Sequence, residues 1–341
     1  MRNVTRPLVL IMGLALLAVT GCKAVGAPGS AAYPGGDVLQ PSQARAEAAA
    51  LLPRFLRAWA LEDSAAMKVV ASPPVLSQEM SQFAQDAPTR TAPPDPEAYT
   101  ATEIKIAVPH QSAYPAHFVA VAIMRTPDYQ PFLVYAEFTK AAAGTPSTID
   151  RYISLDQNAD VPALAVDSQG FAYEVSTALQ LSMLGLGASD LSGGWVDDVN
   201  QVIQNGALVT THFAPTGDTT GIGYNAHNSQ QVASAQSGNG GLSSGFDSVA
   251  DNGIALRTAD GGILEAFTAD ELVTRSTTPG YVYTQDSARQ SFGGLLAPGQ
   301  YSSYTTTYRY SVLAHAPAKG SVTKPEAIGV VAFAVSATGR P

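Results

Sequence analysis

Two short motifs place a serine where it could act as a nucleophile. Residues 241–245 have the G-x-S-x-G spacing of a hydrolase nucleophile elbow, which needs a buried strand before the serine and a helix after it. Residues 237–240 are Ser, Gly, Asn and Gly, so the motif lacks that context. Residues 321–324 have S-x-x-K spacing, but Pro325 disfavours the helical turn that would bring the lysine to the serine. We therefore interpret both motifs as loop sequence.

The residues that could ligate a metal through oxygen or nitrogen atoms show no metal-binding pattern in the sequence. Residues 156–160, followed by Asp167, imitate a calcium loop, but that loop needs Gly at its sixth position and Glu at its twelfth. The five histidines lack ligand spacing such as i, i+4 on a helix, although His110 and His117 flank one loop and could meet in space. We predict no metal and no cofactor, and we interpret the acidic residues as a solvated turn.

Three tyrosines alternate along a predicted strand near the C-terminus. Tyr304, Tyr308 and Tyr310 share one face by the strand period of two, and such rings suit sugar or peptide surfaces. The same residues also suit a half-buried sheet that packs on a helix. We favour the packed sheet and keep the three tyrosines as candidate ligand-facing residues.

The composition of the chain excludes several classes of protein. Its 341 residues include 19 Lys+Arg against 28 Asp+Glu, a formal net charge of −9. An acidic chain with few basic residues has no electrostatic footprint for nucleic acid. A single cysteine excludes a disulfide scaffold and any cysteine-clustered zinc or iron–sulfur site.

Residues 1–21 are predicted to be an export signal. Arg2 and Arg6 precede an apolar run over residues 8–19, which is too short to span a bilayer but has the length of a signal-peptide core. The run ends in Val-Thr-Gly-Cys22, which resembles the lipobox of bacterial lipoproteins. The resemblance implies cleavage before Cys22 and an acyl group, such as palmitate, on its thiol. The alternatives are an ordinary cysteine near a cleaved signal and a short anchor helix.

Residues 22–40 are predicted to be a flexible linker, because they are rich in Gly, Ala and Pro. Loss of Arg2 and Arg6 with the signal makes the mature chain still more acidic, so anionic lipid would repel it. We therefore expect a tethered, extracytoplasmic protein whose membrane contact is the lipid on Cys22. The alanine-rich composition, with more Arg than Lys, fits an actinobacterium.

Residues 41–160 are predicted to form a first α+β domain that begins with helices. A helix should start at Pro41 with Ser42 as its N-cap, and Pro53 should kink or divide it. Asp63 should cap a second short helix. Apolar residues at helical spacing mark the buried face of the first helix (Leu52, Phe55, Leu56 and Trp59) and of a third helix (Leu76, Met80 and Phe83).

A meander of strands should follow these helices. Alternating or continuous apolar residues predict strands at residues 104–108, 118–124, 132–139 and 149–155. Residues 55–63, an aromatic helix that ends in an acidic residue before a short second helix, carry a resemblance to nuclear-transport-factor-like and cystatin-like folds. That resemblance covers roughly residues 42–156 and implies a sheet wrapped around a helix.

Residues 161–341 are predicted to form a second α+β domain, again with helices before antiparallel strands. Helices are expected at residues 171–184 and 196–203, and the polar residues 229–246 are expected to be a loop or a poorly ordered helix end. Strands are expected at residues 254–258, 263–267, 301–315 and 327–335, with a hairpin turn at residues 260–262. The mature chain also resembles an uncharacterised group of actinobacterial lipoproteins around residues 164–167 and 302–313, which brings no activity.

These observations predict an α+β fold of two halves, each with helices followed by an antiparallel sheet. Our first functional hypothesis is a non-enzymatic, lipid-anchored module of the cell envelope that binds a small ligand or an envelope protein. The alternative is a cell-envelope hydrolase, or a similar enzyme, whose pocket residues are dispersed in the sequence.

Overall fold

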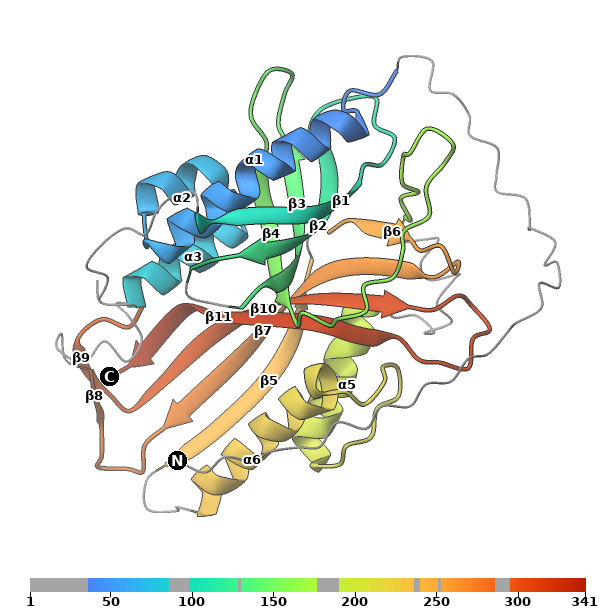
Figure 1. Cartoon of the computed structure of the whole chain (residues 1–341). Helices are drawn as coiled ribbons and strands as arrows, with labels where there is room; N and C mark the ends of the chain where they lie inside the picture. The colour runs from blue at the N-terminus through green and yellow to red at the C-terminus, as the bar shows by residue number, and fades with distance from the viewer. Residues whose placement is uncertain are drawn as a thin grey trace, which may run out of the picture. The chain divides into compact units, whose positions relative to one another are not determined.

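A computed structural model of the chain describes residues 36–85, 98–127, 130–176, 190–235, 240–250, 253–285 and 295–341, which belong to one compact unit. Two antiparallel sheets pack face to face, and each outer face is covered by helices, so the order of layers is helix, sheet, sheet, helix (Figure 1). The predicted α+β class is therefore confirmed. The division into domains at residue 160 stays a prediction.

The first helical layer contains α1 (Pro41–Ala60), α2 (Ser64–Val70) and α3 (Val75–Gln85). The N-cap of α1 is Gln40 rather than the predicted Ser42, because Pro41 has no N–H to satisfy and can occupy the first helical position. Pro53 does not divide α1, which is held on both sides of it by buried leucines and phenylalanine. The predicted cap of α2 is confirmed, since Asp63 accepts from the backbone N–H groups of its first turn at 3.0 and 2.9 Å.

The first sheet is the predicted meander of β1 (Thr100–Ala107), β2 (Ala116–Arg125), β3 (Phe132–Lys140) and β4 (Thr148–Leu155). Successive side chains point to opposite faces. Phe118 and Phe138 stack with ring centroids 4.5 Å apart on the face that packs against α1. Tyr135 and Ile153 point to the other face, where they pack against the second sheet. Both faces are buried, which explains the nearly unbroken apolar sequence of β2.

The second sheet has the order β11-β10-β7-β5, with β6 paired to the start of β7. Its strands are β5 (Gly241–Val249), β6 (Ala255–Arg257), β7 (Ile263–Ser276), β10 (Ser303–Ala316) and β11 (Glu326–Arg340). The hairpin predicted around residues 260–262 is confirmed by the antiparallel pairing of β6 with β7. A separate ribbon pairs β8 (Tyr283–Gln285) with β9 (Gly299–Tyr301).

The outer face of this sheet is covered by α5 (Leu191–Asn205) and α6 (Ile222–Ala235), joined through a π-helical turn at Gly217–Gly221. Trp195 of α5 is fully buried there. The two helices approach closely at Gly223, where a Cβ would lie 2.8 Å from the backbone oxygen of Val199. Any side chain at this position would therefore force α5 and α6 apart.

Two predictions for the second half need correction. Residues 229–246 were expected to be a loop or a helix end, and residues 229–235 are indeed the end of α6, but residues 241–246 belong to β5, an edge strand that tolerates polar residues and buries only Phe246. Residues 171–176 are extended rather than helical, since the Ala172 N–H donates to the Val108 oxygen at 2.8 Å and the Val175 N–H to the Ala255 oxygen at 2.9 Å. Residues 177–184 of that predicted helix lie outside the described residues.

Helix α3 connects the two sheets at one side. Ser81 donates to the backbone oxygen of Ala334 on β11, and Gln78 lies 3.5 Å from the hydroxyl of Ser311 on β10.

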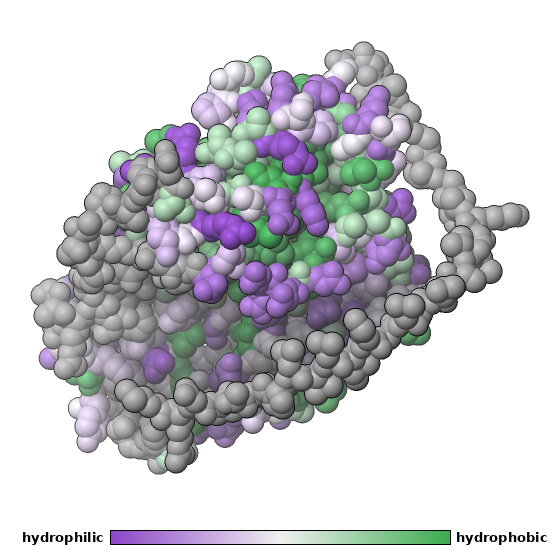
Figure 2. Space-filling view, in the orientation of Figure 1, coloured by the Kyte–Doolittle hydropathy of each residue, from purple (hydrophilic) through white to green (hydrophobic). Residues whose placement is uncertain are grey.

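In the part of the chain that the structure describes, none of the helices has the length and apolar character needed to cross a membrane. On the face shown in Figure 2, a group of hydrophobic residues (green) lies among hydrophilic ones (purple) in the upper part of the molecule.

Candidate functional site

A cavity of about 580 Å³ lies where α1, α3, the end of β4 and the middle of β11 meet. This volume is within the roughly 300–1,000 Å³ of small-molecule sites. Aromatic rings from four elements form much of its wall: Phe55, Trp59, Phe132, Tyr152 and Phe333. We call this cavity the aromatic pocket.

Three buried polar atoms in the aromatic pocket have no hydrogen-bond partner among the described residues. They are Oε2 of Glu79, Oε1 of Gln82 and the hydroxyl oxygen of Tyr152. Glu79 is only 2% exposed. Burial raises the pKa of the Glu79 carboxyl from 4.5 to about 8, so most of it is protonated at neutral pH. Burial, and then the charge of Glu79, also raise the pKa of Tyr152.

The local sequence explains how these groups come together. Phe55 and Trp59 are one helical turn apart on α1, and Glu79 and Gln82 are one turn apart on α3. Tyr152 and Ser154 point to the same side of β4 by the strand period. The Tyr152 ring also packs on Phe55, with centroids 4.7 Å apart.

Helical spacing in the sequence predicts the buried face of α1 that forms the aromatic wall, but Glu79 was not predicted as a site residue. A signal for it is present, because Glu79 lies within the predicted apolar stripe of the third helix, which contains Leu76, Met80 and Phe83. A carboxyl group within such a stripe is rarely buried without a partner.

A second cavity, of about 630 Å³, lies between the two sheets, and we call it the intersheet cavity. Its wall includes a buried ion pair in which Nη1 of Arg151 lies 2.5 Å from Oε2 of Glu137. Arg151 also donates to the Ala266 oxygen at 3.1 Å and to the Thr268 hydroxyl at 3.3 Å. Glu137 accepts from the Tyr135 hydroxyl at 2.9 Å. Glu137 and Arg151 are therefore paired within the protein.

The same cavity contains a chain of hydroxyl groups centred on Asp150. Ser72 and Thr139 each donate to a different oxygen of Asp150. The Thr139 hydroxyl lies 2.8 Å from Nδ1 of His117, and the Ser72 hydroxyl lies 2.8 Å from that of Thr148. This arrangement joins a serine to a histidine only through a carboxylate and a threonine, so His117 is not in position to take the proton of Ser72 directly.

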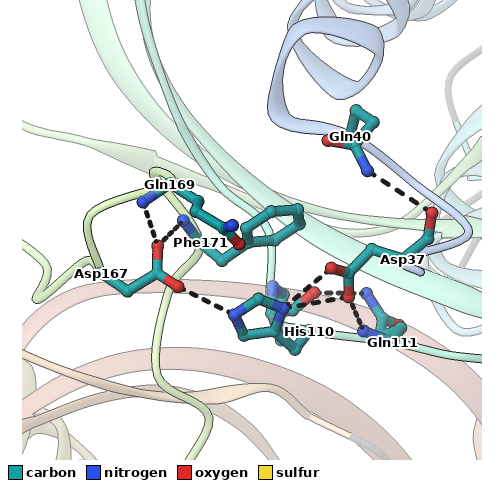
Figure 3. A network of polar contacts seen from close by, with 8 residues as sticks. Asp37, Gln40, His110, Gln111, Asp167, Gln169 and Phe171 are labelled. Atoms are coloured by element: carbon teal, nitrogen blue, oxygen red, sulfur yellow. Dashed lines mark hydrogen bonds and ion pairs between the residues drawn. The ribbon is translucent and has the colours of Figure 1, made fainter. Parts of the chain in front are cut away.

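His110 forms a third polar group, with a carboxylate on each side of its ring (Figure 3). Nδ1 lies 2.9 Å from Asp37, just before α1, and Nε2 lies 2.9 Å from Asp167 in the segment between the sheets. The His110 ring stacks on Phe171 with centroids 4.3 Å apart. The rings of His110 and His117 do not meet, because the His117 ring lines the intersheet cavity and bonds the Thr139 hydroxyl.

The charges in this network support each other. Burial opposes a charge on His110, but hydrogen bonds to Asp167 and Asp37, and the charges of both, raise the pKa of the imidazole. Burial likewise opposes the charge of Asp167, but hydrogen bonds from the Phe171 N–H, His110 and the Gln169 N–H lower the pKa of that carboxyl. The network ties three distant segments together at the surface of the first sheet.

The candidate tyrosines lie on one face of β10, on the side of the second sheet that carries α5. Tyr310 packs against Phe246, with ring centroids 4.9 Å apart, and donates its hydroxyl to Glu271 at 2.8 Å. Tyr304 is 9% exposed and packs edge-on against Tyr283, with centroids 5.1 Å apart. Tyr308 is half-buried. None of the three lines the aromatic pocket or the intersheet cavity.

The remaining candidates do not form a site in the described residues. Cys22 lies outside them. Ser243 is in edge strand β5, and residues 321–324 are in a turn. Asp167 bonds His110, while residues 156–160 line a different cavity with Asp218 and Glu326, so the imitated calcium loop is not assembled. Within the described ranges, no group of three or more His, Cys, Asp or Glu side chains is arranged to hold a metal ion.

Comparison with known proteins assigns a family and no activity. A family model described as a domain of unknown function (DUF8094) matches residues 39–339, which is most of the chain. No curated protein and no solved structure matches the chain. The function therefore has to be argued from the geometry of the cavities.

Proposed function

The chain belongs to this family of domains of unknown function (DUF8094), and we propose that it is a non-enzymatic module that binds a small organic ligand in the aromatic pocket. We further propose that acylated Cys22 tethers it to the outer side of the cell membrane. The observation that carries the binding role is a set of buried polar atoms, on Glu79, Gln82 and Tyr152, that lie inside an aromatic wall and have no hydrogen-bond partner among the described residues.

The energetics of burial support this proposal. A buried polar group without a hydrogen bond costs roughly 1–3 kcal/mol, and three such groups gathered in one cavity add to that cost. Polar groups placed among apolar and aromatic walls are also the usual composition of a ligand site. A bound molecule that donates hydrogen bonds to these groups would offset the cost of burying them.

Titration calorimetry with 2-phenylethanol tests the pocket, because this neutral molecule combines an aromatic ring with one hydroxyl. Ser154 is exposed and lines the pocket, so Ser154→Trp should fill the entrance without disturbing the core. We expect this variant to weaken binding about tenfold or more, which corresponds to about 1.4 kcal/mol, while Ser154→Ala binds like the parent. Equal affinity of all three proteins would contradict a site in this pocket.

Fatty-acid labelling of cells tests the tether. We expect labelled palmitate to appear on the full chain and to be lost in Cys22→Ala. Label that persists in this variant would contradict acylation of Cys22. Mature protein found free in the medium, with its N-terminus beyond residue 22, would also contradict it.

The chain of hydroxyl groups around Asp150 favours one alternative, a hydrolase of the cell envelope that uses the intersheet cavity. Its geometry supports this role less well, because the Asp150 oxygens already accept hydrogen bonds from Ser72 and Thr139. Hydrolysis of p-nitrophenyl acetate by the full chain, lost in both Ser72→Ala and Asp150→Asn, would favour the enzyme. We expect the same slow background rate in all three proteins.

A further inference from the structure

The aromatic pocket contains a buried acid but no basic side chain among the described residues that line it. Its lining includes Glu79 and Asp156 and no Lys, Arg or His. Asp156 is exposed at the rim, so water can solvate its charge, whereas Glu79 is 2% exposed. When Glu79 ionises, its charge is therefore the one in the pocket that neither water nor a basic side chain of the described lining can balance.

The unpartnered atoms have a common chemical character. Oε2 of Glu79 and Oε1 of Gln82 can accept a hydrogen bond, and the Tyr152 hydroxyl can accept as well as donate. A ligand that bonds the ionised form of Glu79 together with the other two atoms would supply an N–H or O–H donor to each of them. An ammonium group has up to three donors around one positive charge.

The wall of the pocket suits a positive charge as well. The faces of aromatic rings carry partial negative charge and attract cations within about 6 Å, with Trp as the strongest of the natural rings. Trp59, Phe55 and Tyr152 bring such rings to the cavity that holds Glu79. The net charge of −9 on the whole chain also draws cations rather than anions toward the protein.

We propose that the aromatic pocket selects organic ammonium ions, with the N–H donors on Glu79, Gln82 and Tyr152 and the apolar body against Phe55 and Trp59. This inference rests on the proposed binding function and names its class of ligand. When the cation binds, the Glu79 O–H bond breaks, the proton goes to solvent, and the carboxylate that remains pairs with the ammonium group. No covalent bond forms between ligand and protein.

The experiment compares two probes of similar size on the full chain at pH 7, by titration calorimetry in two buffers of different ionisation enthalpy. The probes are 2-phenylethylamine, which is a cation, and 2-phenylethanol, which is neutral. We expect the amine to bind about tenfold tighter or more. We also expect it to release about one proton as Glu79 ionises, while the alcohol releases none.

Two variants that each replace a carboxyl group by an amide locate the effect. Glu79→Gln keeps the shape of the side chain and should remove both the preference for the amine and the proton release, while binding of the alcohol remains. Asp156→Asn removes a charge at the rim of the same pocket, and we expect the preference to stay within about twofold of the parent, as for a screened surface charge. An equal loss in both variants would overturn the assignment to Glu79.

The outcomes separate this inference from the proposed function. If the alcohol binds and Ser154→Trp blocks it, but the amine shows no preference and no proton release, the pocket stands and ammonium selection is overturned. If neither probe binds, both proposals are overturned. Proton release from the parent protein requires no variant, so the inference stays testable if Glu79→Gln fails to fold.

Discussion

The aromatic pocket and the intersheet cavity each contain a buried glutamate, and the two glutamates have opposite surroundings. Glu137 accepts hydrogen bonds from Arg151 and Tyr135, and Ile254 donates its backbone N–H at 3.3 Å. An oxygen of Glu79 has no partner among the described residues. The paired glutamate therefore fixes one sheet against the other, and the glutamate without a described partner is the one that we propose bonds a ligand.

The ionisation of Glu79 is expected to have the largest effect on stability, and it tests the comparison of the two glutamates through the dependence of stability on pH. The pKa of Glu79 is raised from 4.5 to about 8, so its contribution to stability is fully present below pH 4.5 and is lost as pH rises through 8. The free energy of unfolding should fall by on the order of 5 kcal/mol across this window. Glu79→Gln should remove that fall.

Urea unfolding of the parent and of Glu79→Gln between pH 4 and pH 9 measures this difference. Asp156→Asn is the matched control, because it changes an exposed carboxyl of the same pocket and should follow the parent curve. Parallel curves for the parent and Glu79→Gln would show that Glu79 is ionised, and hence paired, in the folded protein.

Breaking the pair in the intersheet cavity is expected to have the next largest effect. Arg151→Met leaves the charge of Glu137 buried without its cation, which should destabilise the protein by about 4 kcal/mol at pH 7. Adding Glu137→Gln should recover more than half of that loss, since the amide can still accept from Tyr135. A double variant as unstable as the single one would show that Arg151 acts mainly through packing and its bonds to the second sheet.

A smaller effect is expected at His110, whose partners also come from within the protein. Its pKa is raised, so its contribution to stability is fully present below about pH 6.5 and is lost as pH rises through the raised value. Asp167→Asn should lower the pKa of His110 and destabilise the protein by about 2 kcal/mol at pH 6. An NMR titration of the imidazole in both proteins checks the sign, and an unchanged pKa would show that Asp37 alone holds the charge.

Elements with a local apolar period were predictable from the sequence. The four strands of the first sheet follow from alternating or continuous apolar residues, and the cap of α2 follows from Asp63. Strand β5 was not predictable, because its residues are polar and it is held by neighbours distant in the sequence, such as Asn200, which bonds the backbone of Phe246.

The candidate site shows the same limit. Phe55 and Trp59 were identified as one buried face, because the helical period suffices to find them. Whether Glu79 is buried and unpartnered depends on where β4 and β11 lie, and the sequence of α3 does not contain that information. For the same reason, the period of two placed Tyr304, Tyr308 and Tyr310 on one face but could not show what covers each ring.

The smallest effect on stability is expected at Tyr310, which bonds a third glutamate, Glu271, and Tyr308 provides the control. Glu271 accepts from Tyr310 at 2.8 Å and from Ser244, so it resembles the paired Glu137. Tyr310→Phe should therefore destabilise the protein by about 1 kcal/mol in urea unfolding. Tyr308→Phe, on the same face, should change stability by less than about 0.5 kcal/mol. A larger loss in Tyr308→Phe than in Tyr310→Phe would show that the bond to Glu271 does not stabilise this face, and the tyrosines would again be candidates for ligand contact.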